Sequence, residues 1–223
     1  MFKNRNVHVH LSDVKIGNNI IERVGDSCKE KSFRCLGHWA DENLTWKHHL
    51  DKLQGKLISA NYALSIAKYS VPLRIRKTIY RSLFESHLHF GSIIYGSCDP
   101  RMLNNIINIQ KHAVQSIACA KFAAHTDPLF KSFNILKVTN IISLNQCTFV
   151  HKFRAKRLPK TFDNFFEQIP LRSSSGILNS DYNYKHKNIN HNYLFYLPHY
   201  QLVQSWNCTN MFIKCQGEEN EFK

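Results

Sequence analysis

Neighbouring carboxylates are the first residues of this chain that could do chemistry. Clustered Asp and Glu oxygens hold the two Mg²⁺ ions that assist nucleotidyl transfer, normally with an Asp-Asp pair among them. This chain has no Asp-Asp pair, and its adjacent acids are Asp41-Glu42 and Glu218-Glu219. Asp41-Glu42 lies where a helix is expected to begin, so Asp41 or Asn43 is predicted to cap that helix. We therefore predict no catalytic residue and a chain that is not an enzyme.

Cysteine and histidine residues between positions 28 and 49 are the other candidates for a metal site. Cys28, Cys35 and His38, with His48 or His49, could supply four zinc ligands. A structural zinc site usually takes two cysteines from a knuckle with two to four residues between them, whereas six residues separate Cys28 from Cys35. The apolar setting of Cys35 favours a thiol in the core. We therefore expect no metal and no cofactor.

Two groups of Lys and Arg side chains are the strongest candidates for a functional site. A guanidinium group binds phosphate through two parallel hydrogen bonds, and an ammonium group binds it as a point charge. The first basic set consists of Lys68, Arg74, Arg76, Lys77 and Arg81. The second basic set consists of Lys152, Arg154, Lys156, Arg157 and Lys160. Both could contact nucleic-acid phosphates without reading bases, and the alternative is a solvated helix face without a ligand.

The composition also favours a polyanionic partner. Thirty Lys and Arg residues against sixteen Asp and Glu residues give a formal net charge of +14, which suits nucleic acid or an anionic membrane. No apolar run reaches the roughly 18 residues of a transmembrane helix, and no signal peptide is recognisable. Seven scattered cysteines do not indicate a disulfide framework. We predict an intracellular protein of the cytoplasm or nucleus, with no membrane partner and no small-molecule substrate.

The first 40 residues carry the alternation of apolar and polar residues that strands require. Residues 7–11, 14–16 and 20–24 show this alternation, and a turn is expected at residues 17–19. A further strand is expected at residues 33–36. We predict a β-hairpin and one more strand for this part of the chain.

From residue 42 the apolar residues recur at helical spacing. The first helix is predicted to anchor the core through Trp46, Leu50 and Leu53, and its inward face continues through Leu57, Asn61 and Leu64. A second helix from Pro72 should turn inward Ile75, Ile79, Leu83 and Phe90. A third, capped by Asp99 and with Pro100 in its first turn, should bury Leu103, Ile106, Gln110, Ala113 and Ile117. A short helix at 129–133 and a last one over about 140–157 complete the predicted bundle.

The composition changes again after residue 169. Ser, Asn, Tyr, His and Lys dominate without helical spacing, so we predict an irregular, partly disordered tail with weak strand runs at 193–196 and 211–213. Tyr182, Tyr184, Tyr193 and Tyr196, interleaved with Lys185, Lys187 and His191, could stack on single-stranded RNA, but a disordered tail is the preferred interpretation. The predicted fold is mainly α, and α+β overall. It has a β element over 1–40, a helical bundle over 41–169 and an irregular tail over 170–223.

The segment that begins at Phe33 has the spacing F-x-x-L-G-x-x-x-D-x-x-L-x-W. It resembles the segment just downstream of the catalytic palm in reverse transcriptases of non-LTR retrotransposons, the jockey-like and LINE-like elements. Phe33, Leu36 and Gly37 would form the turn that ends the palm, and the following helices would form the thumb. Further similar stretches, in the family's order, are 80–83, 109–113, 125–130 and 134–138. The resemblance covers about residues 14–217.

This resemblance implies a piece of an RNA-directed DNA polymerase. The turn lies only 32 residues from Met1, so the chain is expected to be a C-terminal fragment that lacks the palm. Its remaining role would be non-specific binding of RNA or of an RNA/DNA template–primer duplex. Tyr95-Gly96 departs from the Trp-Gly of the family. The alternative is a non-catalytic structural or interaction domain, a decayed or domesticated element copy with no nucleic-acid ligand.

Overall fold

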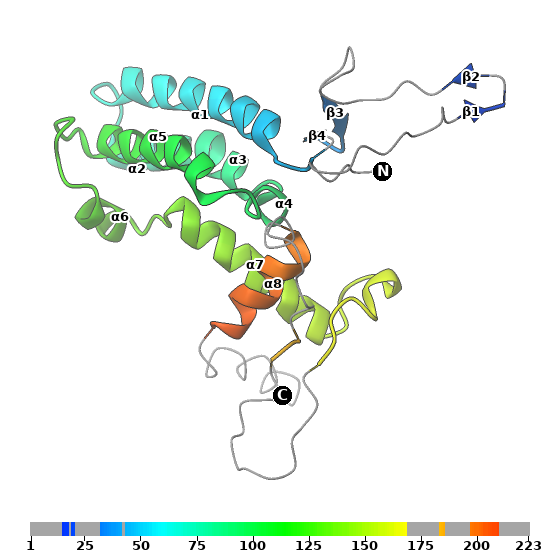
Figure 1. Ribbon diagram of the computed structural model, residues 1–223. Helices are drawn as coiled ribbons and strands as arrows, with labels where there is room; N and C mark the ends of the chain where they lie inside the picture. Colours follow the sequence, from blue (N-terminus) through cyan, green and yellow to red (C-terminus); the bar gives the residue numbers. More distant parts are fainter. Residues whose placement is uncertain are drawn as a thin grey trace, which may run out of the picture. The chain divides into compact units, whose positions relative to one another are not determined.

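The computed structural model describes residues 15–17, 19–20, 32–41, 43–168, 183–185 and 197–209. Most of these residues are helical, and the strands form two small antiparallel pairs near the N-terminus (Figure 1). This confirms the predicted mainly α fold with a small N-terminal β element. The chain divides into two compact units: unit 1 holds Met1–His87 and Cys98–Leu129, and unit 2 holds Leu88–Ser97 and Phe130–Lys223.

Two hairpins make up the β element. Strands β1 (Lys15–Ile16) and β2 (Asn19–Ile20) are antiparallel, and Gly17 between them has a φ of 61°. Strands β3 (Ser32–Cys35) and β4 (His38–Asp41) form the second hairpin. The strand that begins near residue 33 is confirmed. Of the predicted turn at 17–19, Gly17 is a turn residue, Asn18 lies outside the described residues and Asn19 begins β2. The expected strand at 7–11 and most of the one at 20–24 lie outside the described residues.

The turn between β3 and β4 is Leu36-Gly37, the turn that the resemblance places at the end of the palm. The φ angles are 47° at Leu36 and 87° at Gly37, so both residues adopt the left-handed backbone of a type I′ turn. Leu36 is 91% exposed and Phe33 is 47% exposed. Cys35 is exposed as well, so the expectation of a core thiol there is wrong. In β3 only Ser32 is buried.

Replacing Leu36 with Asn is expected to stabilise the hairpin by about 0.5–1 kcal/mol. Asn tolerates left-handed backbone better than Leu does, and Asn-Gly is the favoured sequence of a type I′ turn. Amide hydrogen exchange of β3 and β4 would report the gain as slower exchange. Leu36→Val, whose branched side chain suits this backbone poorly, is the control and should give faster exchange. Faster exchange in the Asn variant would contradict the turn geometry.

The approach to the first long helix differs from the predicted cap. The Asp41 carboxylate accepts hydrogen bonds from the Thr45 N–H at 2.9 Å and from the Thr45 hydroxyl at 2.8 Å. Helix α1 (Lys47–Ala67) starts later, after Trp46 at a φ of 63°, and has no side-chain cap. Asp41 therefore stabilises the turn that follows β4, because several residues separate it from the first helical N–H groups. Asn43 donates its own N–H to the same carboxylate at 3.1 Å.

Helices α1 and α5 (Pro100–Ala118) pack side by side in unit 1 (Figure 1). Trp46, Leu50 and Leu53 are buried as predicted, and the same face continues through the buried Leu57 and Leu64. Helix α5 buries all five predicted residues: Leu103, Ile106, Gln110, Ala113 and Ile117. The carboxylate of Asp99 accepts the Arg101 N–H at 2.9 Å, which confirms the predicted cap.

The second predicted helix has a different inward face. Helix α2 (Leu73–Ile79) continues into a π-helical turn, η1 (Tyr80–Glu85), and then into α3 (Ser86–His89). The prediction that Ile75, Leu83 and Phe90 face inward is wrong, because these side chains are 45%, 47% and 54% exposed. The fully buried residues are instead Tyr80, Phe84 and Leu88. Tyr80 and Phe84 each lie one residue after a predicted position, and both belong to the π-helical turn, which holds more residues than an α turn.

A buried polar pair fixes this register. Gln110 Nε2 donates a hydrogen bond to the Tyr80 hydroxyl at 2.9 Å, and the Tyr80 ring stacks on Phe84 with centroids 5.1 Å apart. Burial raises the pKa of Tyr80 well above its ordinary value, so the phenol stays neutral. The pair satisfies two polar groups that would otherwise be costly in the core.

Unit 2 is built around α7 (Val138–Arg154), with α4 (Ser92–Tyr95) and α8 (Pro198–Asn207) packed against it. Its core cluster consists of Val150, Phe166, Tyr184, Leu202, Val203 and Trp206. Helix α8 lies where the sequence predicted an irregular tail, so that prediction is wrong for residues 198–207. The expected strand runs at 193–196 and 211–213 lie outside the described residues. Helix α6 (Asp127–Phe133) and the short 3₁₀ helix η2 (Lys160–Phe162) complete the described elements.

Candidate nucleic-acid interface

The first basic set is only partly brought together. Arg76 Nη1 donates to the Lys68 carbonyl at 2.9 Å and also contacts Cys119 Sγ, which itself donates to the Lys68 carbonyl at 3.1 Å. Arg76 thus links the C-terminal ends of α1 and α5 to α2, and this structural role occupies its guanidinium group. The Lys68 ammonium lies over the ring of Tyr69, 4.6 Å from its centroid.

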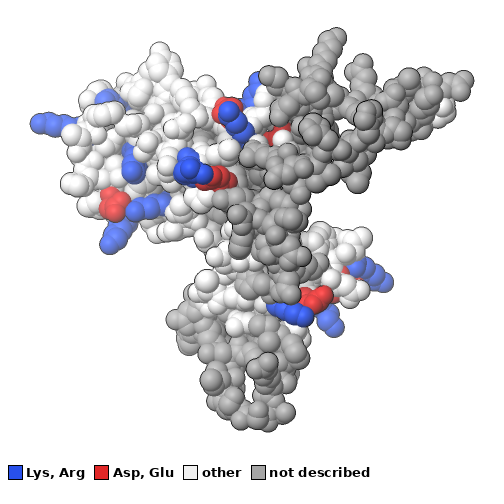
Figure 2. Space-filling model, in the orientation of Figure 1, with Lys and Arg blue, Asp and Glu red and all other residues white. Residues whose placement is uncertain are grey.

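Three other cations of the first set share one helix face. Arg74, Lys77 and Arg81 are spaced three and four residues apart along α2 and η1, and neighbours at these spacings lie on the same side of a helix. Arg74 and Arg81 are exposed, and Lys77 is half-buried. In the view of Figure 2, the Lys and Arg side chains of the described residues stand as separate groups, some beside acidic side chains. With two exposed cations and one half-buried cation on this face, this part of the first set fits a modest phosphate contact or a solvated face.

The second basic set is gathered by the way α7 ends. Lys156 has a left-handed φ of 50°, its N–H donates to the Phe153 carbonyl at 3.0 Å, and the Arg157 N–H donates to the Lys152 carbonyl at 2.9 Å. These two bonds form a Schellman motif, which usually has glycine where this chain has Lys156. The motif folds the chain back over the helix end, so the backbone of Lys156 and Arg157 lies against the last turn of α7, where Lys152 is located. All three are exposed.

The remaining members of the second set differ in accessibility. Lys160 is exposed at the start of η2, whereas Arg154 is half-buried, with its guanidinium carbon 6.0 Å from the centroid of Trp206. Residues 151–162 contain no acid. The negative end of the α7 dipole offsets part of this charge, which gives the cations a structural benefit as well. Four exposed cations nevertheless lie within nine residues of sequence, from Lys152 to Lys160.

The tail tyrosines do not form a stacking surface in the described residues. Tyr184 is 2% exposed and belongs to the core of unit 2, where Asn207 bonds both its N–H and its carbonyl group. Lys185 pairs with Glu167 at 4.0 Å. The other residues of that prediction lie outside the described part of the chain: Tyr182, Lys187, His191, Tyr193 and Tyr196.

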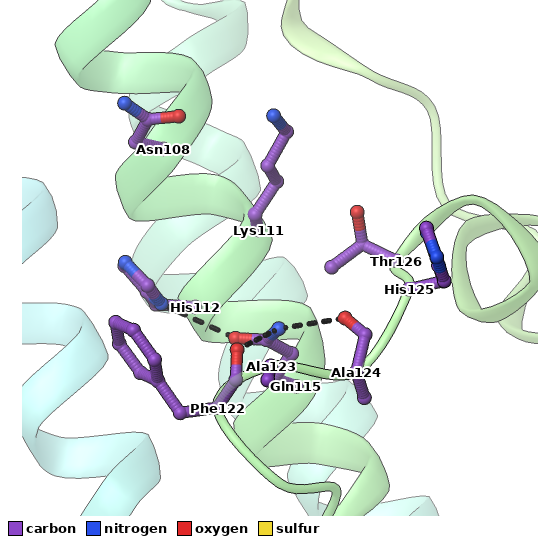
Figure 3. Close-up of a pocket in the computed structure, with 9 residues that line it drawn as sticks. All are labelled: Asn108, Lys111, His112, Gln115, Phe122, Ala123, Ala124, His125 and Thr126. Atoms are coloured by element: carbon purple, nitrogen blue, oxygen red, sulfur yellow. Dashed lines mark hydrogen bonds between the residues drawn. The ribbon is translucent and has the colours of Figure 1, made fainter.

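A surface hollow of about 250 Å³ in unit 1 was not predicted from the sequence (Figure 3). It lies between α5 and the loop that follows it. Its lining residues are Asn108, Lys111, His112, Gln115, Phe122, Ala123, Ala124, His125 and Thr126. None of them is acidic. No motif in the sequence indicated that residues 122–126 lie beside α5.

Two of the histidines that could supply zinc ligands lie together near the β3–β4 hairpin. His38 and His49 have ring centroids 5.0 Å apart. Burial lowers the pKa of His49 to about 4, with smaller contributions from His38 and Lys56, so this imidazole is neutral at physiological pH. Within the described residues, no three His, Cys, Asp or Glu side chains are grouped so that they could hold a metal ion. Cys28 lies outside them.

None of the helices in the described part of the chain is long and apolar enough to cross a membrane. Comparison of the chain with models of protein families, with curated proteins and with solved structures gives no match. The function of the chain is therefore inferred from its own residues.

Proposed function

We propose that this chain binds nucleic acid through backbone phosphates, as the thumb-like region downstream of the palm in a reverse transcriptase of a jockey-like mobile element. The observation that carries the proposal is the exposed cationic group at the end of α7: Lys152, Lys156, Arg157 and Lys160. The order of the similar stretches over residues 14–217 supports the origin. The ligand class is RNA or an RNA/DNA duplex.

The chemistry of this site is electrostatic. The Arg157 guanidinium can bind two oxygens of one phosphate, and the lysine ammonium groups can bind neighbouring phosphates as point charges. Such contacts displace counterions and position a strand without reading its bases. The site thus holds a nucleic acid and does no chemistry on it. Since the sequence has no Asp-Asp pair, we also propose that these residues carry no polymerase centre, and that the protein acts inside the cell.

The test is to replace the four exposed cations of the second basic set with Gln: Lys152, Lys156, Arg157 and Lys160. The slope of log K against log salt is expected to fall by roughly 0.7–0.9 for each phosphate that the variant no longer binds. Binding of two unrelated RNA sequences, measured by fluorescence anisotropy, should weaken equally, because phosphate contacts carry no base information.

A control variant with the same change in net charge separates a local site from a general charge effect. Four exposed lysines elsewhere serve for it: Lys47, Lys52, Lys56 and Lys131. The control should keep most of the parent affinity and slope. Equal weakening in both variants, or an affinity that barely depends on salt in the parent, would refute a phosphate site at the end of α7.

An exposed apolar stripe favours a second candidate, a protein-interaction domain without a nucleic-acid ligand. Ile58, Tyr62 and Ile66 recur every four residues on α1 and are 50%, 68% and 61% exposed, on the side opposite its buried leucines. Such a stripe is typical of a helix that packs against a partner. The parent chain in the salt titration decides between the two functions, since an interaction domain would bind no RNA at physiological salt.

A further inference from the structure

We infer that the hollow between α5 and the 119–126 loop binds one nucleotide of a single-stranded nucleic acid, with its base stacked on Phe122 and its phosphate on Lys111. This inference rests on the proposed function for its class of ligand. It adds a second contact, made by different residues, and a preference for unpaired bases. No sequence motif suggested it, because the lining residues come from a helix and from a loop that follows it.

The ring of Phe122 is exposed to solvent and rests against a neighbouring histidine ring. It is 79% exposed, unusual for a phenylalanine, and one face stacks on the His112 ring with centroids 4.6 Å apart and planes 15° apart. The aromatic pair is therefore already in the parallel arrangement that a nucleobase would extend. Bases of a single strand stack on such exposed rings, whereas bases inside a duplex are already stacked on each other.

Buried Gln115 fixes the loop that carries this ring. Its side-chain amide donates to the Phe122 carbonyl at 2.8 Å and to the Ala124 carbonyl at 3.0 Å. Its Oε1 lies 3.2 Å from Nδ1 of His112, so the Gln115 side chain joins the loop to the His112 ring on which Phe122 stacks (Figure 3). Gln115 is only 7% exposed. A binding surface fixed in this way loses little conformational entropy when a ligand arrives.

The rest of the hollow suits a phosphate and a base edge. Lys111 projects from α5, and Thr126 and His125 lie on the loop beside it (Figure 3). These groups can donate to phosphate oxygens, and the amide of Asn108 can both donate to and accept from a base. The lining includes no carboxylate that would repel a phosphate. A volume of about 250 Å³ is below the range of typical drug-sized pockets, so it suits one nucleotide of a strand rather than a larger ligand.

The test compares a single-stranded oligoadenylate with an RNA duplex of the same length, using the full chain and fluorescence anisotropy. Phe122→Ala is expected to weaken binding of the single strand about tenfold and to leave duplex binding unchanged. Lys111→Gln should flatten the salt slope for the single strand by roughly 0.7. Because Phe122 is 79% exposed, its removal should not affect folding, which circular dichroism would verify. Tyr62→Ala removes another exposed aromatic ring from unit 1 and should behave like the parent.

The outcomes separate this inference from the proposed function. If the Phe122 variant binds the single strand as well as the parent does, or loses duplex affinity to the same extent, the stacking site is refuted. The phosphate site at the end of α7 is tested independently, by the variant in which its four exposed cations are replaced with Gln. A parent chain that binds neither probe would refute both. Photo-crosslinking of a 4-thiouridine oligonucleotide should label the peptide that contains Phe122, and labelling only elsewhere would also overturn the inference.

Discussion

Replacing Trp46 with Ala should destabilise the protein by about 3–5 kcal/mol, the usual cost of removing a buried tryptophan. Trp46 is 7% exposed and directly precedes α1, where its carbonyl accepts the N–H of Leu50 at 2.9 Å. Alanine keeps the same left-handed strain at this position, so the loss reports the ring alone. Urea denaturation followed by circular dichroism would measure it.

An exposed aromatic residue in α1 provides the control. Tyr62 is 68% exposed, so Tyr62→Ala should change the free energy of unfolding by less than about 0.5 kcal/mol. A loss below about 1 kcal/mol for the Trp46 variant would mean that the ring contributes little to the core of unit 1, and would contradict the proposed anchor.

Gly96→Ala should cost about 3 kcal/mol, at the upper end of the usual range for overpacking. An added Cβ would lie 2.3 Å from the Ser92 carbonyl oxygen and 2.4 Å from Cγ2 of Ile142. The first contact is with the backbone of α4, and the second is with a stiff, β-branched side chain that is 6% exposed. Neither neighbour can move without disturbing the packing of α4 on α7. The backbone of Gly96, with a φ of −64°, would itself accept alanine, so the effect is steric.

Gly55→Ala in α1 is the control, because the same substitution should be stabilising there. A Cβ added there meets no atom within 4 Å, so Gly55→Ala should stabilise α1 by up to about 1 kcal/mol through helix propensity. Gly96→Ala and Ile142→Ala combined should cost less than the sum of the two single losses, because the smaller side chain removes one clash, whereas the clash with the Ser92 carbonyl remains. A Gly96 variant as stable as the parent would show that α4 and α7 are less closely packed than described.

The parts of the fold that the sequence predicted well are those in which local spacing and burial agree. The buried faces of α1 and α5 follow regular helical spacing, and the Asp99 cap with Pro100 is a local signal. The second helix failed because its register depends on the π turn and on Gln110, a partner 30 residues away. Helix α8 was missed because its sequence has few apolar residues to show a helical spacing. Its buried residues, Leu202, Val203 and Trp206, pack in a core that includes Val150 of α7.

The candidate site also combines features that local sequence predicts with features that depend on contacts between distant residues. Sequence proximity was enough to group the second basic set, because its members lie in the last turn of α7 or shortly after it. It could not show that Arg76 is engaged by the carbonyl of Lys68, nor that Tyr184 is a core residue. The hollow beside Phe122 depends on the hydrogen bonds of Gln115 to a loop, and neither composition nor periodicity indicates such bonds.

The division of the chain into units has a consequence for its synthesis. Residues 88–97 belong to unit 2 but leave the ribosome before residues 98–129, which complete unit 1. Unit 1 can therefore close its core once Leu129 has emerged, while α4 must wait for α7 and α8. During that interval the two helices that pack against α4 have not yet emerged from the ribosome, although Tyr95 of α4 is fully buried in the finished protein. This nascent intermediate is the stage at which a chaperone would be most useful.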